Sequence, residues 1–501
     1  MVDRTPHANP AQLYANAEHE YRTWHETVIN DPDYPVLHLA PPVGRLNDPN
    51  GLFYDKGIYH AFYQYAPTHP EHQVFWRHAT STDLLHWQDD KSAIDPVDWY
   101  DKRGCYSGSA FIAPDGTYEF YYTGNVKDEN EVRSSYQCLV TSDDECETFV
   151  KQHDVNPLIM SQPEGYTAHF RDPKVWEEDG KYYALLGAQH DDLTGAILKY
   201  SSDDRRTWTF DGEITFDKPF EQHMGYMWEC PAVARMTDTA TGQVRDVLIF
   251  SPQGMDAAGN RFANLYQCGY VVGELNGTHF TLDSEFIELD AGFEFYAPQP
   301  FYNIEGENGE ITIGAWCGLS DQDMHPSWEN HWLHCLTLPR IFTLTNGRIV
   351  QRPADQINDE LTLNATEFID GEVAAIKDQR VFRVSGTLDV SNGPVSLELH
   401  DQAGKTMYVT FAEKSVVMDR SGNRYLAAGK TRTADLSAKA ERTFDLIVDS
   451  SVVEIYIDGG ETTFTARCYF KDDSRTLKFT NEFSQDASSQ VSDLKFAALQ
   501  K

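Results

Sequence analysis

The sequence has no long apolar run. None of its 501 residues lies in a stretch near the roughly 18 consecutive apolar residues that a membrane-spanning helix needs. The first ten residues are polar and lack the apolar segment of a secretory signal. With 41% apolar and 13% aromatic residues, the chain can form a packed core and is too apolar for a disordered one. We therefore expect a globular protein with no membrane partner.

Basic residues are also scarce. The chain carries 41 Lys and Arg against 78 Asp and Glu, which gives a formal net charge of −37. A field of this sign repels polyanions, so neither nucleic acid nor anionic lipid is expected as a partner. A phosphorylated small molecule would need a local cluster of basic side chains.

Paired cysteines are absent as well. The eight cysteines are scattered, without CxxC spacing or matching histidines, so the sequence predicts neither a zinc site nor a disulfide framework. We expect free thiols, a cytoplasmic location, and no metal or cofactor. Whether the chain forms a homo-oligomer is left open.

The sequence does contain a repeat of about sixty residues. Similar strand-like runs begin at Gly57, Gly116, Gly180, Asp246 and Glu310. Successive starts are 59 to 66 residues apart, and no helical periodicity interrupts the region. Self-similarity at a fixed period is typical of propellers and solenoids. Five units of several short strands predict a five-bladed β-propeller over residues 37–344.

The two ends of the chain differ from this region. Apolar residues recur at helical spacing over residues 10–30, which predicts an amphipathic helix in an N-terminal extension of residues 1–36. After residue 344 aromatic residues become fewer, and alternating runs such as 444–448 are separated by turns. Residues 355–501 are expected to form a β-sandwich. The predicted fold class is all-β, in two domains, because the chain is too long for one hydrophobic core.

Acidic residues occupy equivalent positions in three of the five units. The segment before each repeated strand is expected to be the innermost strand of its blade, with its first residues facing the axis. These segments are Asn47-Asp48-Pro49-Asn50-Gly51, Ser107-Gly108-Ser109, Arg171-Asp172-Pro173, Glu229-Cys230-Pro231 and Tyr296-Ala297-Pro298-Gln299. Asp48, Asp172 and Glu229 should therefore converge. Each precedes Pro or Cys-Pro, which we expect to end strand pairing and to fix the direction of the side chain.

Carboxyl groups gathered in this way suit glycoside cleavage. Like charges in one site do not all ionise easily, so one carboxyl gains a raised pKa and donates a proton while another stays ionised. In retaining glycosidases two carboxyls lie roughly 5 to 5.5 Å apart; one attacks the anomeric carbon and the other protonates the leaving oxygen. An isolated Asp-Pro usually marks only a turn, but recurrence in register favours catalysis.

In order along the chain these motifs resemble glycoside hydrolase family 32, the invertases and fructosidases, over nearly the whole sequence. The resemblance implies a five-bladed propeller that bears the active site, followed by a β-sandwich. It implies Asp48 as nucleophile, Glu229 as acid/base, and Asp172 as stabiliser of the oxocarbenium-like charge. The residues implied to hold the fructosyl hydroxyls are Asn47, Gln64, Ser107, Arg171 and Asp172. Arg171 is further expected to orient Asp172 and keep it ionised, with a purely structural salt bridge as the alternative.

One departure from the family pattern narrows the range of expected substrates. Many invertases have Trp-Gly-x-x-x-Trp-Gly-His where this chain has His72-Gln73-Val74-Phe75-Trp76-Arg77-His78. With Ser251-Pro252-Gln253-Gly254, this segment looks more like the cytoplasmic bacterial sucrose-6-phosphate hydrolases. The aromatic residues expected to form a wall against a sugar face, with core packing as the alternative, are Trp76, Tyr296 and Trp316. His72 and Arg77 are the nearest cationic candidates for a 6-phosphate, with a solvent-facing Arg77 as the alternative.

The predicted function is retaining hydrolysis of the terminal β-D-fructofuranoside of sucrose 6-phosphate or sucrose, through a covalent fructosyl-enzyme intermediate. Fructo-oligosaccharides are an alternative substrate, and fructosyl transfer shares the first chemical step. An inverting hydrolase on a related propeller would hold its carboxyls farther apart to admit water. A non-catalytic propeller that binds carbohydrate is the remaining alternative.

Overall fold

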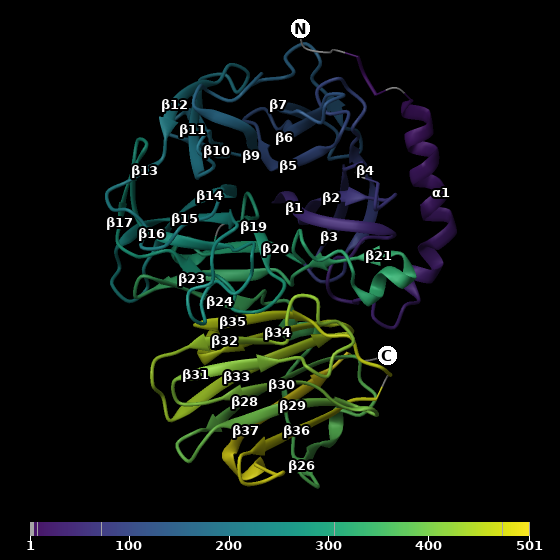
Figure 1. Cartoon of the computed structure of the whole chain (residues 1–501), viewed down its shortest axis with the longest axis vertical. Helices are drawn as coiled ribbons and strands as arrows, with labels where there is room; N and C mark the ends of the chain where they lie inside the picture. Colours follow the sequence, from purple (N-terminus) through teal and green to yellow (C-terminus); the bar gives the residue numbers. More distant parts are fainter. Residues whose placement is uncertain (1–4, 8, 72, 305, 473, 500–501) are drawn as a thin grey trace.

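The computed structural model describes residues 5–7, 9–71, 73–304, 306–472 and 474–499, and its secondary structure is almost entirely β (Figure 1). Two α-helices occur in these ranges, α1 (Pro10–Ile29) and α2 (Ile357–Glu360). Short 3-10 turns are η1 (Glu307–Gly309), η2 (Pro326–Asn330), η3 (Ala374–Ile376), η4 (Asp458–Gly460) and η5 (Ser488–Gln490). The prediction of an all-β fold is confirmed. Neither helix combines the length and the apolar character needed to cross a bilayer.

Residues 44–353 form five sheets. The first sheet has the order β21-β1-β2-β3-β4, from β1 (Gly44–Asp55), β2 (Ile58–Ala66), β3 (Phe75–Ser81), β4 (Gln88–Ile94) and the later segment β21 (Trp332–Leu333). The second contains β5 (Cys105–Ile112), β6 (Tyr118–Lys127), β7 (Arg133–Ser142) and β8 (Val150–Lys151). The third contains β9 (Tyr166–Glu178), β10 (Lys181–His190), β11 (Gly195–Ser202) and β12 (Thr209–Glu213).

Each of the other two sheets also contains one or two short additional strands. The fourth contains β14 (Met227–Thr237), β15 (Val244–Gln253), β16 (Gly269–Asn276) and β17 (His279–Leu282), with β13 (Thr215–Phe216) and β18 (Ile287–Glu288) at its margins. The fifth contains β19 (Tyr296–Pro300), β20 (Ile311–Cys317), β23 (Arg340–Thr345) and β24 (Arg348–Pro353), with β22 (Cys335–Leu336) paired to β20. All five sheets are mainly antiparallel.

The glycines of the sequence repeat close the hairpins between the first and second strands. Gly57, Gly116 and Gly180 have φ angles of 86°, 89° and 78°, in the left-handed region that glycine enters without steric cost. The repeat seen in the sequence is therefore a repeat of this hairpin.

The first strands of the five sheets contact one another in a closed circuit. β1 contacts β5, β5 contacts β9, β9 contacts β14, β14 contacts β19, and β19 contacts β1. A separate hydrophobic cluster lies between each pair of successive sheets, as where Phe53 and Phe62 of the first sheet pack against Phe120 of the second. The fifth cluster joins the last sheet back to the first, through Trp316 and Leu46 among others. The parallel pairing of β21 with β1, at Gly44 and Trp332, adds backbone hydrogen bonds to this closure.

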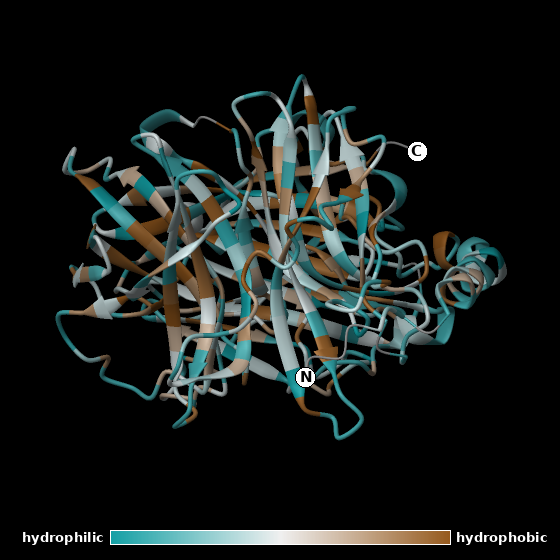
Figure 2. Ribbon diagram, turned by 90° about the horizontal axis from the view of Figure 1, so that it is seen from above, coloured by the Kyte–Doolittle hydropathy of each residue, from teal (hydrophilic) through white to brown (hydrophobic). Residues whose placement is uncertain are grey.

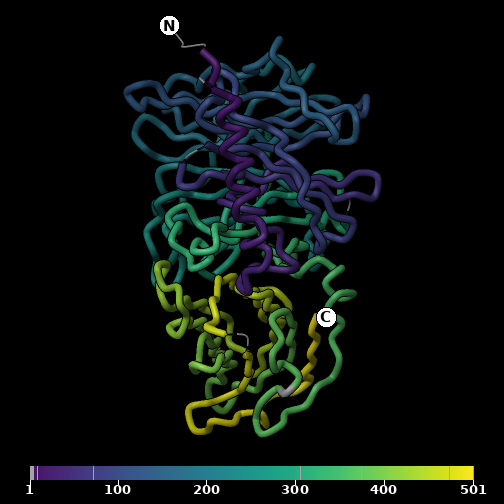
Figure 3. Tube along the Cα trace, turned by 90° about the vertical axis from the view of Figure 1, so that its right-hand side faces the viewer, coloured from purple at the N-terminus to yellow at the C-terminus, as the bar shows by residue number. Residues whose placement is uncertain are grey.

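The predicted N-terminal helix is present and lies on the outside of the first sheet. Pro10 occupies its first turn, and the Asn9 side chain caps it by accepting a hydrogen bond from the Gln12 N–H at 3.1 Å. Leu13 and Val28 are its buried residues. Figure 3 shows α1 running along the outside of the strands. In Figure 2 the apolar stretches lie along the strands and the hydrophilic ones mainly at the loops.

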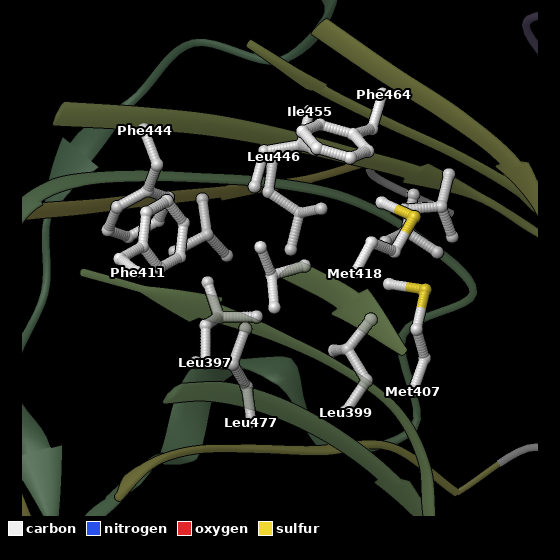
Figure 4. Packing of buried hydrophobic residues seen from close by; sticks show 14 of the residues in the cluster. Leu397, Leu399, Met407, Phe411, Met418, Phe444, Leu446, Ile455, Phe464 and Leu477 are labelled. Carbon is white, nitrogen blue, oxygen red and sulfur yellow. The ribbon is translucent and has the colours of Figure 1, made fainter. Parts of the chain in front are cut away.

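The C-terminal region is a β-sandwich, as predicted. One sheet has the order β25 (Asn364–Ala365), β37 (Val491–Ala498), β28 (Val381–Asp389), β33 (Glu441–Asp449), β34 (Val452–Ile457) and β35 (Thr462–Arg467). The other has the order β26 (Phe368–Ile369), β27 (Glu372–Val373), β36 (Thr476–Asn481), β29 (Val395–Asp401), β30 (Gly404–Phe411), β31 (Ser415–Asp419) and β32 (Thr431–Asp435). Figure 4 shows Leu397 and Phe411 facing Phe444 and Leu446 across the core between the sheets.

The two regions meet at a buried group of charged side chains, here called the junction network. Arg340 of β23 donates to Asp290 at 3.0 Å and to Glu454 of β34 at 2.9 Å. His38 contacts Glu454 at 3.2 Å and Asp449 at 2.7 Å. Burial opposes charge on Glu454, but Arg340 and His38 outweigh it and lower the pKa of Glu454 to about 2. Each charge in this network therefore has a partner.

Candidate active site

Each first strand carries a β-bulge at the motif singled out in the sequence. The register between first and second strands shifts between Leu46 and Pro49, Tyr106 and Gly108, Arg171 and Lys174, Glu229 and Ala232, and Tyr296 and Gln299. A bulge tolerates a proline, which has no N–H to donate, and it redirects the neighbouring side chain. The prediction that proline ends strand pairing is wrong, because β9 and β14 continue past Pro173 and Pro231.

Asp48 is held by side chains from two sheets. The Ser107 hydroxyl, from β5, donates to Asp48 Oδ2 at 2.6 Å. Gln64 Nε2, from the end of β2, donates to the same oxygen at 3.2 Å and to Ser107 Oγ at 2.5 Å. These bonds favour the ionised carboxylate and fix its position.

Asp172 lies deeper and is strained. Its φ angle of 66° is in the left-handed region, which is unfavourable for a residue other than glycine. Its own N–H donates to Thr123 Oγ1 at 3.0 Å, and its Oδ2 accepts from the Cys230 N–H at 3.0 Å. Cys230 follows Glu229 directly in the sequence. This bond therefore joins the third sheet to the fourth next to the Asp172 and Glu229 carboxyls.

Glu229 makes the most contacts of the three carboxyls. Arg171 donates to its Oε1 from Nε at 2.7 Å and forms a second contact there at 2.5 Å. Gln253 Nε2 and the Tyr296 hydroxyl each donate to Oε2 at 2.6 Å. The sequence predicts that Arg171 orients Asp172, but the guanidinium binds Glu229 instead.

The three carboxyls lie close enough to disturb each other's ionisation. Burial, and then the charge of Glu229, raise the pKa of Asp48 to about 6, although the Ser107 hydrogen bond opposes the rise. Burial and Glu229 likewise raise the pKa of Asp172 to about 7. The structure thus brings together the three acidic residues that the sequence singles out, from three different sheets.

Solvent reaches only part of this group. The Glu229 side chain is 13% exposed and that of Arg171 7%, whereas Ser107 and Asp172 are buried. Asn47 and Asp48 are partly exposed beside them. A ligand would therefore reach Asp48 and Glu229 directly. Within the described ranges, no group of three or more His, Cys, Asp or Glu side chains is arranged to hold a metal ion.

The predicted aromatic wall is mostly inaccessible. Trp76 has no exposed surface, packs between the first and second sheets, and donates its Nε1–H to the Tyr106 carbonyl at 3.0 Å. Trp316 is also fully enclosed, beneath the Arg45 guanidinium. Neither ring has a face that a sugar could touch, so for these two residues core packing replaces the predicted role. Tyr296 reaches the site through its hydroxyl and not its ring face.

Of the two predicted phosphate contacts, Arg77 is not at the site. Arg77 lies on the face of β3 toward α1, where its guanidinium binds Asp89 through two bonds of 2.5 Å and stacks near Tyr21 and Tyr65. Its charge is compensated, and it points away from the carboxyls because neighbouring residues of a strand face opposite sides. The prediction for Arg77 is wrong. His72 lies outside the described residues.

Sequence reasoning missed several residues around the carboxyls. Gln253 occupies the end of the second strand of its sheet, as Gln64 does in the first, and each amide donates to a carboxyl on the adjoining first strand. Because a glutamine recurs near the end of the second strand in two units, the sequence could have identified Gln253 as a site residue. Arg45, which donates to Asn47 Oδ1 at 2.8 Å and forms an ion pair with Asp323 at 3.0 Å, carried no such signal.

The chain is similar over most of its length to known glycosyl hydrolases. Residues 38–353 match the profile of the glycosyl hydrolases family 32 N-terminal domain, and residues 347–498 match that of the glycosyl hydrolases family 32 C terminal. The chain is 39% identical over 481 residues to the sucrose-6-phosphate hydrolase of Bacillus subtilis (strain 168), covering 92% of this chain and 94% of that protein. It is 35% identical over 459 residues to the raffinose invertase of Escherichia coli, covering 89% and 91%. The solved structure of the sucrose-6-phosphate hydrolase from Lactobacillus gasseri is 30% identical, with a TM-score of 0.85 over 96% of each chain.

Proposed function

This chain belongs to the glycosyl hydrolases of family 32, and from that premise we propose how it cleaves a terminal β-D-fructofuranoside. It is a glycosidase acting on sucrose-type substrates, as its named relatives are. The proposed substrates are sucrose 6-phosphate and sucrose, and the proposed route is retaining, through a covalent fructosyl-enzyme intermediate. The observation that carries the mechanism is the convergence of Asp48, Asp172 and Glu229.

Asp48 is the proposed nucleophile. With a pKa of about 6 it is mostly ionised at pH 7, and Ser107 and Gln64 hold Oδ2, which leaves Oδ1 to attack. Attack forms a bond from that oxygen to the anomeric carbon as the glycosidic C–O bond breaks, and the leaving oxygen takes a proton from Glu229.

Glu229 is the proposed acid/base. After the first step its carboxylate removes a proton from water, whose oxygen attacks the anomeric carbon and returns Asp48 to its ionised form. Glu229 needs a proton before the first step, yet in this structure Arg171 pairs with it. We expect the guanidinium to turn to the fructosyl hydroxyls when substrate enters, which would release Glu229 from this ion pair.

Asp172 is the proposed stabiliser. Its carboxylate would accept hydrogen bonds from fructosyl hydroxyls and offset the positive charge that develops on the ring. Asn47, Gln64, Ser107 and Arg171 are proposed as further contacts with the fructosyl unit. A pKa of about 7 leaves Asp172 only partly ionised at pH 7, so approach of a positive transition state would favour its charged form.

The arrangement of the five sheets as blades of a propeller is part of the proposal. It is supported by the closed circuit of contacts among the first strands. The corresponding domains are residues 37–344 and 355–501, with an N-terminal extension of residues 1–36. We also propose a cytoplasmic location, supported by eight free cysteines, of which Cys317 and Cys335 lie opposite each other on paired strands. The proposed ligand is a small sugar, with neither nucleic acid nor membrane as partner.

The anomer released first tests the retaining route. NMR spectra recorded during rapid hydrolysis of sucrose should show β-D-fructofuranose as the initial product. Initial release of the α-anomer would instead indicate an inverting enzyme.

A further inference from the structure

Three nitrogen-bearing side chains, Arg171, His169 and Arg133, lie near Glu229. Arg171 binds Glu229, and its NH1 group also donates to His169 Nδ1 at 3.0 Å. Burial, then Arg171, then Arg133 lower the pKa of His169 to about 4, so the imidazole is neutral at pH 7. Arg133 therefore adds a second guanidinium near Glu229.

The fold places Arg133 near the start of β9. Arg133 opens β7, and two residues later the Ser135 hydroxyl donates to the Ala168 carbonyl at 2.7 Å. Residues two apart in a strand share a face, so Arg133 faces the third sheet, where His169 lies. The Arg133 guanidinium carbon is also 5.7 Å from the centre of the Tyr106 ring, next to Ser107 in the sequence.

Arg133 has no carboxylate partner within the part of the chain that the structure describes. Its neighbours on this edge do: Arg103 and Lys127 both pair with Glu131, at 3.5 Å and 2.8 Å. Arg133 is half-buried, and that burial lowers the pKa of its guanidinium without making it neutral. A partly desolvated cation that forms no ion pair with a described carboxylate is unusual in a chain with 78 acidic residues, and it favours an anion from outside the protein.

His169 supplies a second donor. Arginine has no acceptor atom, so Nδ1 must accept from Arg171, and the ring proton of neutral His169 lies on Nε2. That N–H has no protein acceptor among the described residues, and the side chain is partly exposed. Among the described residues, this group thus offers one guanidinium without a carboxylate partner and one ring N–H without a protein acceptor.

We propose that Arg133 determines specificity for a disaccharide phosphorylated on its leaving sugar, by binding the 6-phosphate with His169 as a second donor. The inference rests on the proposed function, in which Glu229 protonates the leaving oxygen and so marks the leaving-group side. The planar guanidinium fork matches two phosphate oxygens. It also offsets the repulsion between a phosphate and the three carboxyls. Unphosphorylated sucrose has no group that needs Arg133.

Kinetics of Arg133→Gln test this proposal. The variant should lower the ratio of kcat/KM for sucrose 6-phosphate to that for sucrose by roughly 10- to 100-fold, since it removes hydrogen bonds to a charged group. Arg133→Lys keeps the charge but loses the fork, so the ratio should fall less. Arg103→Gln, an arginine on the same edge that already has a partner, is the matched control and should leave the ratio unchanged.

Product inhibition gives a second readout with sucrose as the only substrate. Glucose 6-phosphate should inhibit the wild-type enzyme more strongly than glucose, and Arg133→Gln should remove that difference. Equal loss on both substrates, or an unchanged ratio, would overturn the role of Arg133 while the hydrolase mechanism stands. If the wild-type enzyme releases fructose from neither substrate, the proposed function itself is wrong.

Discussion

Two groups of buried carboxyls lie in this molecule under opposite electrostatic conditions. In the junction network, Arg340 and His38 face Glu454, and the pKa of Glu454 falls to about 2. Among the first strands, Asp48 and Asp172 lie near Glu229, which pairs with Arg171, and their pKa values rise to about 6 and 7. Burial is common to both groups, so the balance of partners decides the direction of the shift.

The two groups therefore affect stability with opposite dependence on pH. Glu454, with a lowered pKa, stabilises the fold above about pH 4.5, and this contribution is lost as the pH falls toward 2. Asp48, with a raised pKa, costs stability increasingly as the pH rises from about 4 to 6, and the cost is constant above that. The junction is a structural device, whereas the acidic cluster gives up some stability for reactivity.

Asp48→Asn should have the largest effect of these substitutions. It should lower turnover without lowering stability. Removal of the nucleophile should lower kcat on sucrose by several orders of magnitude, about 10³-fold or more. The melting temperature at pH 7 should not fall, because the substitution removes one of three crowded negative charges. A variant that keeps more than a tenth of the turnover would rule out Asp48 as nucleophile.

Arg340→Met should instead lower stability. It leaves Asp290 and Glu454 buried without their guanidinium, at a cost of about 3–5 kcal/mol in the free energy of unfolding. The partly exposed Arg352, which pairs with Asp355, provides the control: Arg352→Gln should cost less than about 1 kcal/mol. Urea titrations compare the two. Similar midpoints would mean that the junction network is not stabilising.

Ser107→Ala should move a pH profile. The Ser107 hydroxyl stabilises ionised Asp48, so its loss should raise the pKa of Asp48 above about 6. The acid limb of kcat/KM, where activity falls as Asp48 takes up a proton, should shift to higher pH by about half a unit to one unit. Thr123→Ser, which keeps a hydroxyl beside Asp172, should leave this limb in place. An unshifted limb in Ser107→Ala would assign it to another group.

Arg77→Gln should have the smallest effect. Because Arg77 binds Asp89 on the α1 side of β3, the ratio of kcat/KM for sucrose 6-phosphate to that for sucrose should change by less than about twofold. A larger change would return this arginine to the list of phosphate contacts and weaken the case for Arg133.

Features that repeat along the chain could be predicted from the sequence. Features that depend on the face of a strand from which a side chain projects could not. The glycine turns and the acidic motifs recur at a fixed interval, so the five units and the convergence of three carboxyls could be predicted. The role predicted for Trp76 is wrong because the sequence does not distinguish a tryptophan that packs in a core from one that lines a sugar-binding pocket. Arg77 was misplaced because one step along a strand reverses its face. Arg133 belongs to no motif, and its proposed role depends on the lack of a carboxylate partner among the described residues, which only three-dimensional structure reveals.

The pairing of β21 with β1 ties the order of synthesis to the assembly of the site. The strand that bears Asp48 is made early, but one of its edges is covered only when Trp332 has left the ribosome. Until then that edge is open to pairing with another chain, and the circle of sheets is incomplete. A chain that stops before this point would hold all three acids in its sequence and yet lack the closure that keeps them together, with aggregation as the expected result.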